Sequence, residues 1–279
     1  MRAVQPVVVA HRGASTHRAE HTLAAYALAL EQGADGLECD VRLTRDGHLV
    51  CVHDRRVDRT SSGRGVVSTL TLEHLHGLDY ESWHVEPPEH ADDLVTTHRT
   101  TPRRERRSGV LTLESLLELV IDTGATLFVE TKHPVRYGAL VEAKLVALLS
   151  RFGLAKPPSK EDSPVVLMSF SARAVKRMRE QAPSLPTVLL QETLPLVRRD
   201  GSLPPYADLT GPDVALLRAD PDYVARSAQH GHGTYCWTVD EPADILLCQR
   251  LGVRFLATNS PAATRAVLDG NPDGNVAIR

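Results

Sequence analysis

The sequence predicts an α/β protein folded as a single (β/α)8 barrel, and two observations support this fold class. Short β-branched runs alternate with stretches of helical periodicity along the chain, the pattern of parallel strands joined by crossover helices. The chain has 279 residues, and one barrel of this type takes about 250. One barrel with a modest insertion and a short tail therefore accounts for the length.

Nine segments have the composition of strands, although a barrel of this type has eight places. One of them must be spurious or lie outside the ring, and the short Val214 to Leu217 segment is the weakest. The nine are Val7 to Ala10, Gly36 to Leu43, Leu49 to His53, Leu127 to Lys132, Val165 to Phe170, Thr187 to Gln191, Val214 to Leu217, Thr234 to Val239, and Phe255 to Thr258.

Helical periodicity fills most of the connections between these strands. We expect Ser171, Asp220 and Ser260 to cap helices, and Pro221 and Pro261 to occupy first helical positions. The predicted helices are Thr22 to Gln32, Leu113 to Thr123, Arg136 to Phe152, Ala172 to Gln181, Pro221 to Gln229, Pro242 to Leu251, and Pro261 to Leu268.

Two regions interrupt this alternation. Thr44 to Gly47 is a turn signature that leaves no room for a helix, so it predicts a hairpin-like return. Residues 79–109 are polar and irregular, which predicts an insertion over one end of the barrel. Its basic part predicts either a solvated loop or a binding loop, and has five arginines against Glu105: Arg99, Arg103, Arg104, Arg106 and Arg107.

The composition excludes several classes of protein. The net charge of -3 gives no global basic field for nucleic acid or an anionic membrane. No apolar run approaches the roughly 18 residues of a membrane span, and the N-terminus lacks a secretory cleavage signal, so we expect a cytoplasmic protein. The four cysteines form no CxxC pair, which favours reduced thiols in the core.

Acidic residues end two of the predicted strands, and in such a barrel the carboxyl ends of the strands carry the chemistry. Glu38 and Asp40 are two apart and share the interior face of a strand if Leu37, Cys39 and Val41 pack outward. Their carboxylates repel each other unless a cation or a proton neutralises one. Each acid alone would suit an ordinary ion pair.

A later strand ends on a third acid, Glu130. Three acids at strand ends favour a bound cation over three separate ion pairs. Oxygen ligands without a cysteine favour Mg²⁺ or Ca²⁺ over Zn²⁺. The sequence therefore predicts a site for one divalent cation.

Histidines and basic residues stand at the same strand ends. Two imidazoles with pKa values near neutrality, here His11 and His53, can divide proton donation and proton abstraction between them. Arg12 follows His11, and Lys132 shares a strand face with Glu130. Arginine and lysine beside a divalent cation make a site for a phosphate. A nucleotide-type glycine-rich loop is lacking, which argues against nucleotide-driven transfer.

These residues belong to an ordered series of short motifs. The motifs are HRGA at 11–14, EHT at 20–22, ECDV at 38–41, DG at 46–47, VHD at 52–54, ETK at 130–132, SF at 169–170 and WTV at 237–239. The series resembles the glycerophosphodiester phosphodiesterases, in particular actinobacterial-type members, over nearly the whole chain. The resemblance implies a single TIM-barrel domain over residues 1–270, with a small insertion after the third strand at about 54–109, and a C-terminal tail at 271–279.

The resemblance also implies an activity, the metal-dependent hydrolysis of glycerophosphodiesters to sn-glycerol 3-phosphate and an alcohol. These diesters are deacylated phospholipid head groups. Either histidine can be the acid, and the nucleophile can be water or a glycerol hydroxyl. The implied roles are metal ligands for Glu38, Asp40 and Glu130, acid-base catalysis for His11 and His53, and phosphate contacts for Arg12 and Lys132.

The chain departs from the usual family pattern at three positions. His21 stands in place of an asparagine, Asp240 follows WTV in place of an asparagine, and Asn259 replaces an aspartate. We expect none of them to touch the metal or acid-base residues, so they bear on substrate range more than on activity. Trp237 either packs in the core or forms an apolar wall against the alcohol part of the substrate, and Phe170 has the same two options.

Other functions compete with this one. The enzyme alternatives are a lysophospholipase D or a phosphodiesterase for a different alcohol, although no basic amphipathic helix is evident. A non-catalytic binder of phosphorylated ligands would not need a proton donor and acceptor together. Nucleic-acid binding through the arginine-rich insertion would weaken steeply with salt. We expect a small-molecule substrate as partner, no nucleic acid and no stable membrane insertion, and the sequence has no signal for an oligomeric state.

Overall fold

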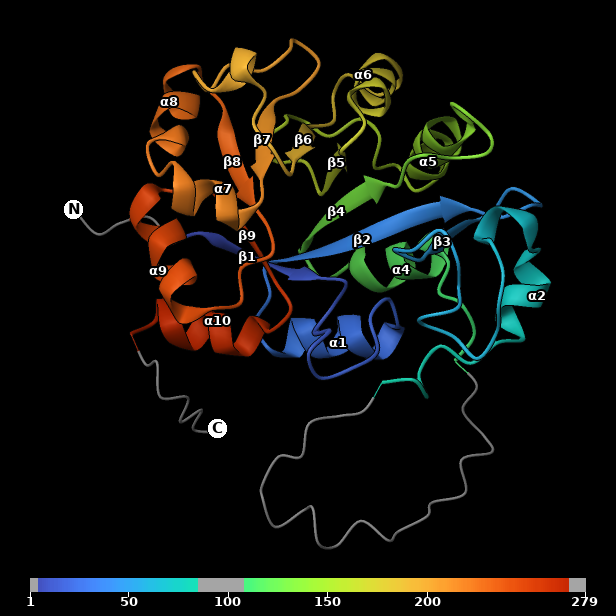
Figure 1. Cartoon of the computed structure of the whole chain (residues 1–279). Helices are drawn as coiled ribbons and strands as arrows, with labels where there is room; N and C mark the ends of the chain where they lie inside the picture. Colours follow the sequence, from blue (N-terminus) through green and yellow to red (C-terminus); the bar gives the residue numbers. More distant parts are fainter. Residues whose placement is uncertain (1–4, 85–107, 271–279) are drawn as a thin grey trace, which may run out of the picture.

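The computed structural model describes residues 5–84 and 108–270, and its strands form one continuous sheet (Figure 1). The strands are β1 (Val7–His11), β2 (Gly36–Leu43), β3 (Leu49–Cys51), β4 (Thr126–Thr131), β5 (Val165–Ser169), β6 (Thr187–Gln191), β7 (Leu209–Pro212), β8 (Gly233–Cys236) and β9 (Phe255–Thr258). Their order is β1-β9-β8-β7-β6-β5-β4-β2-β3, and β1 also pairs with β2. That last pairing closes eight parallel strands into the predicted barrel.

Helices lie between the strands and surround the ring in Figure 1. Two short 3-10 helices, η1 (Val67–Thr69) and η2 (Leu196–Arg198), lie in connections. The α-helices are α1 (Leu23–Glu31), α2 (Leu72–His76), α4 (Leu113–Val120), α5 (Leu140–Arg151), α6 (Ala172–Gln181), α7 (Val214–Ala219), α8 (Tyr223–Gln229), α9 (Pro242–Leu251) and α10 (Pro261–Leu268).

Two of the nine predicted strands do not belong to the ring. The Leu49 to His53 segment forms β3, which pairs antiparallel with β2 through the predicted turn. The Val214 to Leu217 segment is helical, because Asp213 caps it by accepting a hydrogen bond from the Ala215 amide. An apolar run of four residues does not distinguish a strand from a helix turn.

The eighth barrel strand is β7, which is not among the nine predicted strands. It has four residues and contains Gly211 and Pro212, both of which are rare in strand interiors. Glycine fits there because a Cβ at Gly211 would come within 2.7 Å of the Leu190 side chain. Close packing against β6 therefore explains why a glycine, which is uncommon in strands, occupies position 211.

Helix starts were predicted with mixed success. Ser171 caps α6 and Pro261 opens α10 as expected. Asp220 instead ends α7, and α8 begins at Tyr223, two residues after Pro221. Ser260 is at the N-cap position without a side-chain capping bond, and α5 begins at residue 140, not 136.

The core has separate parts inside and outside the ring. Barrel strands bury large apolar side chains inside, including Phe128, Met168 and Tyr235. Leu37, Cys39 and Val41 pack outward into another cluster, as expected. All four cysteines are buried and free. A small cluster that includes Val57, η1 and α2 covers β3, so the described part of the predicted insertion has its own apolar contacts.

Some expectations fall on residues that the structure does not describe. The five arginines of residues 99–107 and the tail at 271–279 lie outside the described residues. The domain boundaries at 1–270 and 54–109 stay predictions. Within residues 5–84 and 108–270, no helix combines the length and apolar character needed to cross a bilayer. The cytoplasmic location stays a prediction.

Candidate active site

The carboxyl ends of the barrel strands surround a cavity of about 380 Å³. Its lining includes seven of the eight residues that the sequence analysis selected, namely His11, Arg12, Glu38, His53, Glu130, Lys132 and Trp237. The eighth, Asp40, is buried beside them and pairs with Arg12 and Lys132. The structure therefore brings together all eight residues from distant parts of the chain.

Glu38, Asp40 and Glu130 form a compact acidic cluster. One carboxylate oxygen from each lies within 4.8 Å of the other two, and all three residues are buried. The strand register places them together, because β2 pairs parallel with β4 and sets Asp40 opposite Glu130. Oxygen atoms at this spacing could hold a metal ion.

The charges in this cluster are incompletely balanced. Burial and repulsion from Asp40 raise the pKa of Glu38 well above its usual value and that of Glu130 to about 8. Burial also opposes ionisation of Asp40, but Lys132 and Arg12 outweigh it and hold the pKa of Asp40 well below its usual value. A divalent cation would let all three carboxylates ionise together, so the donor set fits such an ion.

Two basic side chains border the acidic cluster. Lys132 Nζ lies 2.9 Å from Glu130 Oε1 and 3.3 Å from Asp40 Oδ1. Arg12 Nε lies 3.0 Å from Asp40 Oδ2, and its backbone amide donates to Glu38 Oε2. Arg12 reaches this position through a left-handed backbone with φ of 60°, a conformation that is costly for a residue with a side chain and clusters at functional sites.

The glycine of the HRG motif has a packing role. Gly13 has φ of 86°, and a Cβ on it would lie 2.7 Å from Ala25 of α1. Only glycine accommodates both constraints. The close approach of α1 to this loop therefore holds His11 and Arg12 at the barrel mouth.

A hydrogen-bond chain fixes the tautomer of His11. Asn259 Nδ2 donates to Asp240 Oδ2 at 2.6 Å, because a carboxylate can only accept. This orientation turns Asn259 Oδ1 toward His11 Nδ1, 2.9 Å away. Nδ1 must donate to it, so Nε2 has a free lone pair. Burial and the charge of Arg12 lower the pKa of His11 to about 4, so the ring is neutral at pH 7.

His53 has a carboxylate partner instead of an amide. Its Nδ1 lies 2.8 Å from Asp54 Oδ1, and Arg59 donates to the other oxygen of Asp54. Burial lowers the pKa of His53, while Asp40 and Asp54 favour its charged form. The two histidines thus have different hydrogen-bond partners in one cavity.

Two of the three departures from the family pattern touch the site directly, and the third acts through one of them. The expectation that none would touch the metal or acid-base residues is wrong. Asn259 contacts His11, and Asp240 orients Asn259. His21, with φ of 59°, lies 3.0 Å from Asp40 Oδ2 through Nε2. These contacts join residues distant in sequence, so the motifs gave no sign of them.

Exchanging the amide and the carboxylate beside His11 tests the cause of its low pKa. Asp240→Asn/Asn259→Asp puts a carboxylate against Nδ1, which stabilises the imidazolium and raises the His11 pKa. In a bell-shaped profile of kcat/KM against pH, we expect the limb that reports His11 to move up by about 1 pH unit or more.

Asp54→Asn is the opposite change at the other histidine. It removes a group that raises the His53 pKa, so the limb that reports His53 should move to lower pH. The limb that moves in each variant identifies the acid and the base. Unchanged limbs in both variants would contradict this account of the two histidines.

Several polar residues at the mouth were not selected from the sequence as functional. Glu20 bridges Arg12 and Arg59, and Arg59 also contacts Asp54. His133 lines the cavity and lies 2.7 Å from Glu142, a glutamate with no exposed surface. Their positions in the sequence could have indicated them, because Glu20 and Asp54 lie within the EHT and VHD motifs and His133 directly follows the ETK motif.

Aromatic side chains form one wall of the cavity. Trp237 and Phe170 both line it and meet edge to face, with ring centroids 5.1 Å apart. The indole Nε1 donates to Gly211 O at 2.8 Å, which fixes the ring. Phe170 also lies under Lys132, with Nζ 5.6 Å from the ring centroid. Trp237 and Phe170 therefore line the cavity and also pack against each other.

The sequence model of the glycerophosphoryl diester phosphodiesterase family matches residues 11–263. The chain belongs to this family. The predicted family, fold class and enzyme class are thereby confirmed.

Relatives in the glycerophosphoryl diester phosphodiesterase family match most of the chain. A Mycobacterium tuberculosis protein named "Probable glycerophosphodiester phosphodiesterase 1" is 51% identical over 98% of this chain and 96% of its own length. A Bacillus subtilis glycerophosphodiester phosphodiesterase is 33% identical over 95% of this chain and 87% of its own length.

Solved structures share the fold of the family. A glycerophosphodiester phosphodiesterase from Agrobacterium tumefaciens superposes with a TM-score of 0.72 at 25% identity, covering 94% of this chain and 100% of that one. An Oleispira antarctica phosphodiesterase in complex with the product sn-glycerol-3-phosphate gives 0.76 at 22% identity, covering 95% and 97%.

Proposed function

We propose that the chain hydrolyses glycerophosphodiesters to sn-glycerol 3-phosphate and an alcohol, and that it requires one divalent cation. The observation that carries the proposal is the juxtaposition, in one cavity, of three carboxylates, two basic groups and two histidines with different partners. The relatives named for this activity and the product bound to the Oleispira enzyme support the substrate class.

Glu38, Asp40 and Glu130 hold the cation in this proposal, and their oxygen donors suit Mg²⁺ or Ca²⁺. When bound, the ion supplies Lewis-acid stabilisation of negative charge on the phosphoryl group. Lys132 and His21 orient the ligands, since Lys132 contacts Asp40 and Glu130 and His21 contacts Asp40.

Arg12 and Lys132 bind the phosphate. Both line the cavity, and their positive charges lie where negative charge increases during attack on phosphorus. Backbone and carboxylate contacts hold Arg12 in place before substrate arrives, which reduces the cost of reorganisation. Trp237 and Phe170 give the substrate an apolar wall.

His11 and His53 move the protons. One imidazole accepts a proton from the nucleophile, and the other gives a proton to the leaving alkoxide. Water as the nucleophile gives sn-glycerol 3-phosphate directly, whereas a hydroxyl of the glycerol first gives a cyclic phosphate that water then opens. Asn259 holds His11 with Nε2 unprotonated, and Asp54 stabilises positive charge on His53. The pH profiles of the two variants above decide which histidine has which role.

The proposal predicts weak discrimination among uncharged and cationic alcohols. A site rejects an analogue strongly only when its own buried polar groups are left unpaired. In the described lining, the one acidic residue outside the metal cluster is Glu192, and it is exposed. We expect kcat/KM for the choline, ethanolamine and glycerol diesters of glycerol 3-phosphate to agree within roughly two orders of magnitude.

An aryl diester provides the contrast in the same assay. Bis(p-nitrophenyl) phosphate lacks the glycerol hydroxyls, so we expect it to be far poorer than glycerophosphocholine. Comparable kcat/KM for these two compounds would mean that glycerol is not recognised. The proposed substrate class would then give way to a general phosphodiesterase.

A further inference from the structure

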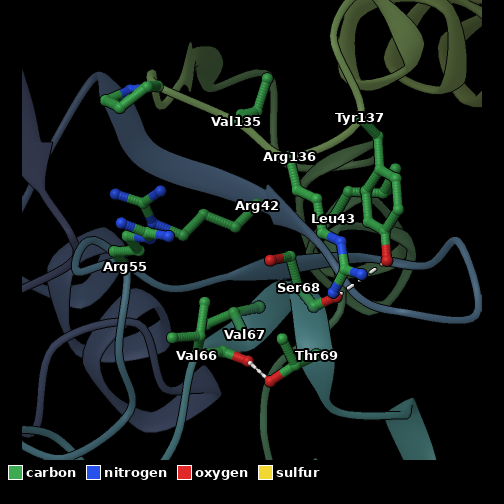
Figure 2. A pocket seen from close by; sticks show the side chains of 11 residues that line it. Arg42, Leu43, Arg55, Val66, Val67, Ser68, Thr69, Val135, Arg136 and Tyr137 are labelled. Atoms are coloured by element: carbon green, nitrogen blue, oxygen red, sulfur yellow. Dashed lines mark hydrogen bonds between the residues drawn. The ribbon is translucent and has the colours of Figure 1, made fainter.

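A second cavity, of about 430 Å³, lies at the outer end of β2 (Figure 2). Its wall comes from three places in the chain, namely the end of β2, the segment from Arg55 to η1, and the loop that follows β4. Cavities of a few hundred Å³ are large enough for small-molecule groups. No residue of this cavity was selected in the sequence analysis.

The second cavity adjoins the active site through all three of these segments. On β2, Glu38 lines the active site and Arg42 lines the second cavity. Asp40 and Arg42 share one strand face, about 6–7 Å apart along the strand. His53 and His133 line the active site, while Arg55 and Pro134, one or two residues later, line the second cavity.

Three arginines, Arg42, Arg55 and Arg136, line this second cavity and have no carboxylate partner among the described residues. Among the described residues, no carboxylate lies within ion-pair distance of Arg42, Arg55 or Arg136, whereas the neighbouring Arg56 pairs with Asp58 at 3.0 Å. Burial and the nearby charge of Arg55 lower the pKa of Arg42, although Asp40 and Glu130 favour its charged form. Like charges gathered in a cavity favour an anion there.

Two of the three arginines, Arg42 and Arg136, make contacts that position their side chains before any ligand arrives, whereas Arg55 is exposed. Arg42 donates from Nε and Nη2 to the His53 carbonyl oxygen, at 2.9 and 2.7 Å. The Arg136 guanidinium lies 5.7 Å from the ring centroid of Tyr137. Tyr137 in turn donates its hydroxyl to Ser68 O at 2.8 Å, a bond visible in Figure 2. Positioned guanidinium groups match the geometry of phosphate oxygens.

We propose that this second cavity binds a phosphate carried on the alcohol part of the diester, so that the enzyme favours glycerophosphodiesters with a second phosphate. This inference rests on the proposed function. A substrate whose first phosphate lies by Arg12 and Lys132 would extend its alcohol past His53 toward Arg42, Arg55 and Arg136. The cavity thus adds an anion requirement to a site that otherwise has little selectivity.

The test compares glycerophosphoinositol with glycerophosphoinositol 4-phosphate, which differ by one phosphate. Titration calorimetry in the presence of a chelator measures their dissociation constants without turnover. The variant is Arg55→Gln/Arg136→Gln, because both side chains are exposed and neither touches the catalytic residues. The matched control is Arg56→Gln, an exposed arginine paired with Asp58 on the same segment.

We expect wild type and Arg56→Gln to bind the 4-phosphate at least about tenfold more tightly than glycerophosphoinositol, as charge-assisted hydrogen bonds allow. The double variant should bind the two within about twofold. Equal affinities in wild type, or an undiminished preference in the double variant, would overturn the inference.

Inorganic phosphate distinguishes a free anion from one carried by the substrate. If the double variant loses phosphate binding while wild type does not distinguish the two diesters, the cavity takes a free anion and the inference is overturned. A failure of the proposed function would give a different result from a failure of this inference. Adding Mg²⁺ or Ca²⁺ to wild type with either diester would then release no glycerol 3-phosphate, whatever the ratio of the affinities.

Discussion

Glu38→Gln/Asp40→Asn is expected to abolish turnover and to remove stabilisation of the fold by divalent metal. Two of the three clustered carboxylates become neutral amides of almost the same shape, so the cation loses charged ligands while the packing is retained. For wild type, metal at 100 times its dissociation constant raises the free energy of unfolding by about 2.7 kcal/mol. The double variant should gain almost nothing.

Without metal, the two halves of this variant act in opposite directions: Asp40→Asn removes a charge that pairs with Arg12 and Lys132 and so costs stability, whereas Glu38→Gln stabilises the fold. Glu38 has a folded-state pKa raised well above its usual value by burial and Asp40. Such a group stabilises the fold below its unfolded pKa, and this contribution is lost as the pH rises toward the folded value. At pH 7 in chelator, ionisation therefore costs wild type stability, and glutamine removes that cost.

Glu192→Gln is the matched control for this measurement. Glu192 lines the same cavity but is exposed and lies outside the acidic cluster. We expect it to keep the metal-dependent rise in thermal stability and most of the activity. Unchanged metal binding in Glu38→Gln/Asp40→Asn, measured by calorimetry, would disprove the assignment of the ligands.

Replacing either His11 or His53 with alanine is expected to lower kcat by at least about a hundredfold, the usual effect of removing a general acid or base. The effect should fall on kcat more than on KM, since Arg12 and Lys132 remain to bind the phosphate. Stopped or quenched assays with glycerophosphocholine give both constants.

His230→Ala controls for the loss of an imidazole elsewhere. His230 ends α8 and is exposed at the opposite, amino-terminal side of the strands, so its removal should leave kcat unchanged. Thermal unfolding of all three variants reports whether they remain folded. A folded His53→Ala enzyme with more than about a tenth of the wild-type kcat would exclude His53 as the general acid or base.

The sequence predicted the barrel and most of the mouth because those signals are local. An apolar run that ends in a charged residue indicates both a strand and its functional end, as in β2 and β4. The prediction failed where the local composition of a segment did not match its secondary structure. Gly211, which packs under Leu190, and Pro212 give β7 a composition that is not typical of a strand, so no strand was predicted there. Val214 to Leu217 is an apolar helix turn that was predicted as a strand.

Contacts between distant elements could not be predicted in the same way. Barrel closure places β9 beside β1, and only this pairing brings Asn259 to His11, 248 residues away in sequence. Asp240 and Asn259, the two unusual residues near the C-terminus, are therefore in contact with each other. In the sequence alone they look like two independent changes. The arginines of the second cavity likewise come from three separate segments.

The most direct test of the central claim is product identification with glycerophosphocholine, in metal-loaded enzyme and in enzyme treated with chelator. Phosphorus NMR distinguishes the two possible cleavages. We expect sn-glycerol 3-phosphate and choline with metal, no products with chelator, and recovery when Mg²⁺ or Ca²⁺ is restored. Phosphocholine and glycerol as products, or hydrolysis that persists undiminished in chelator, would contradict the proposed metal-dependent reaction.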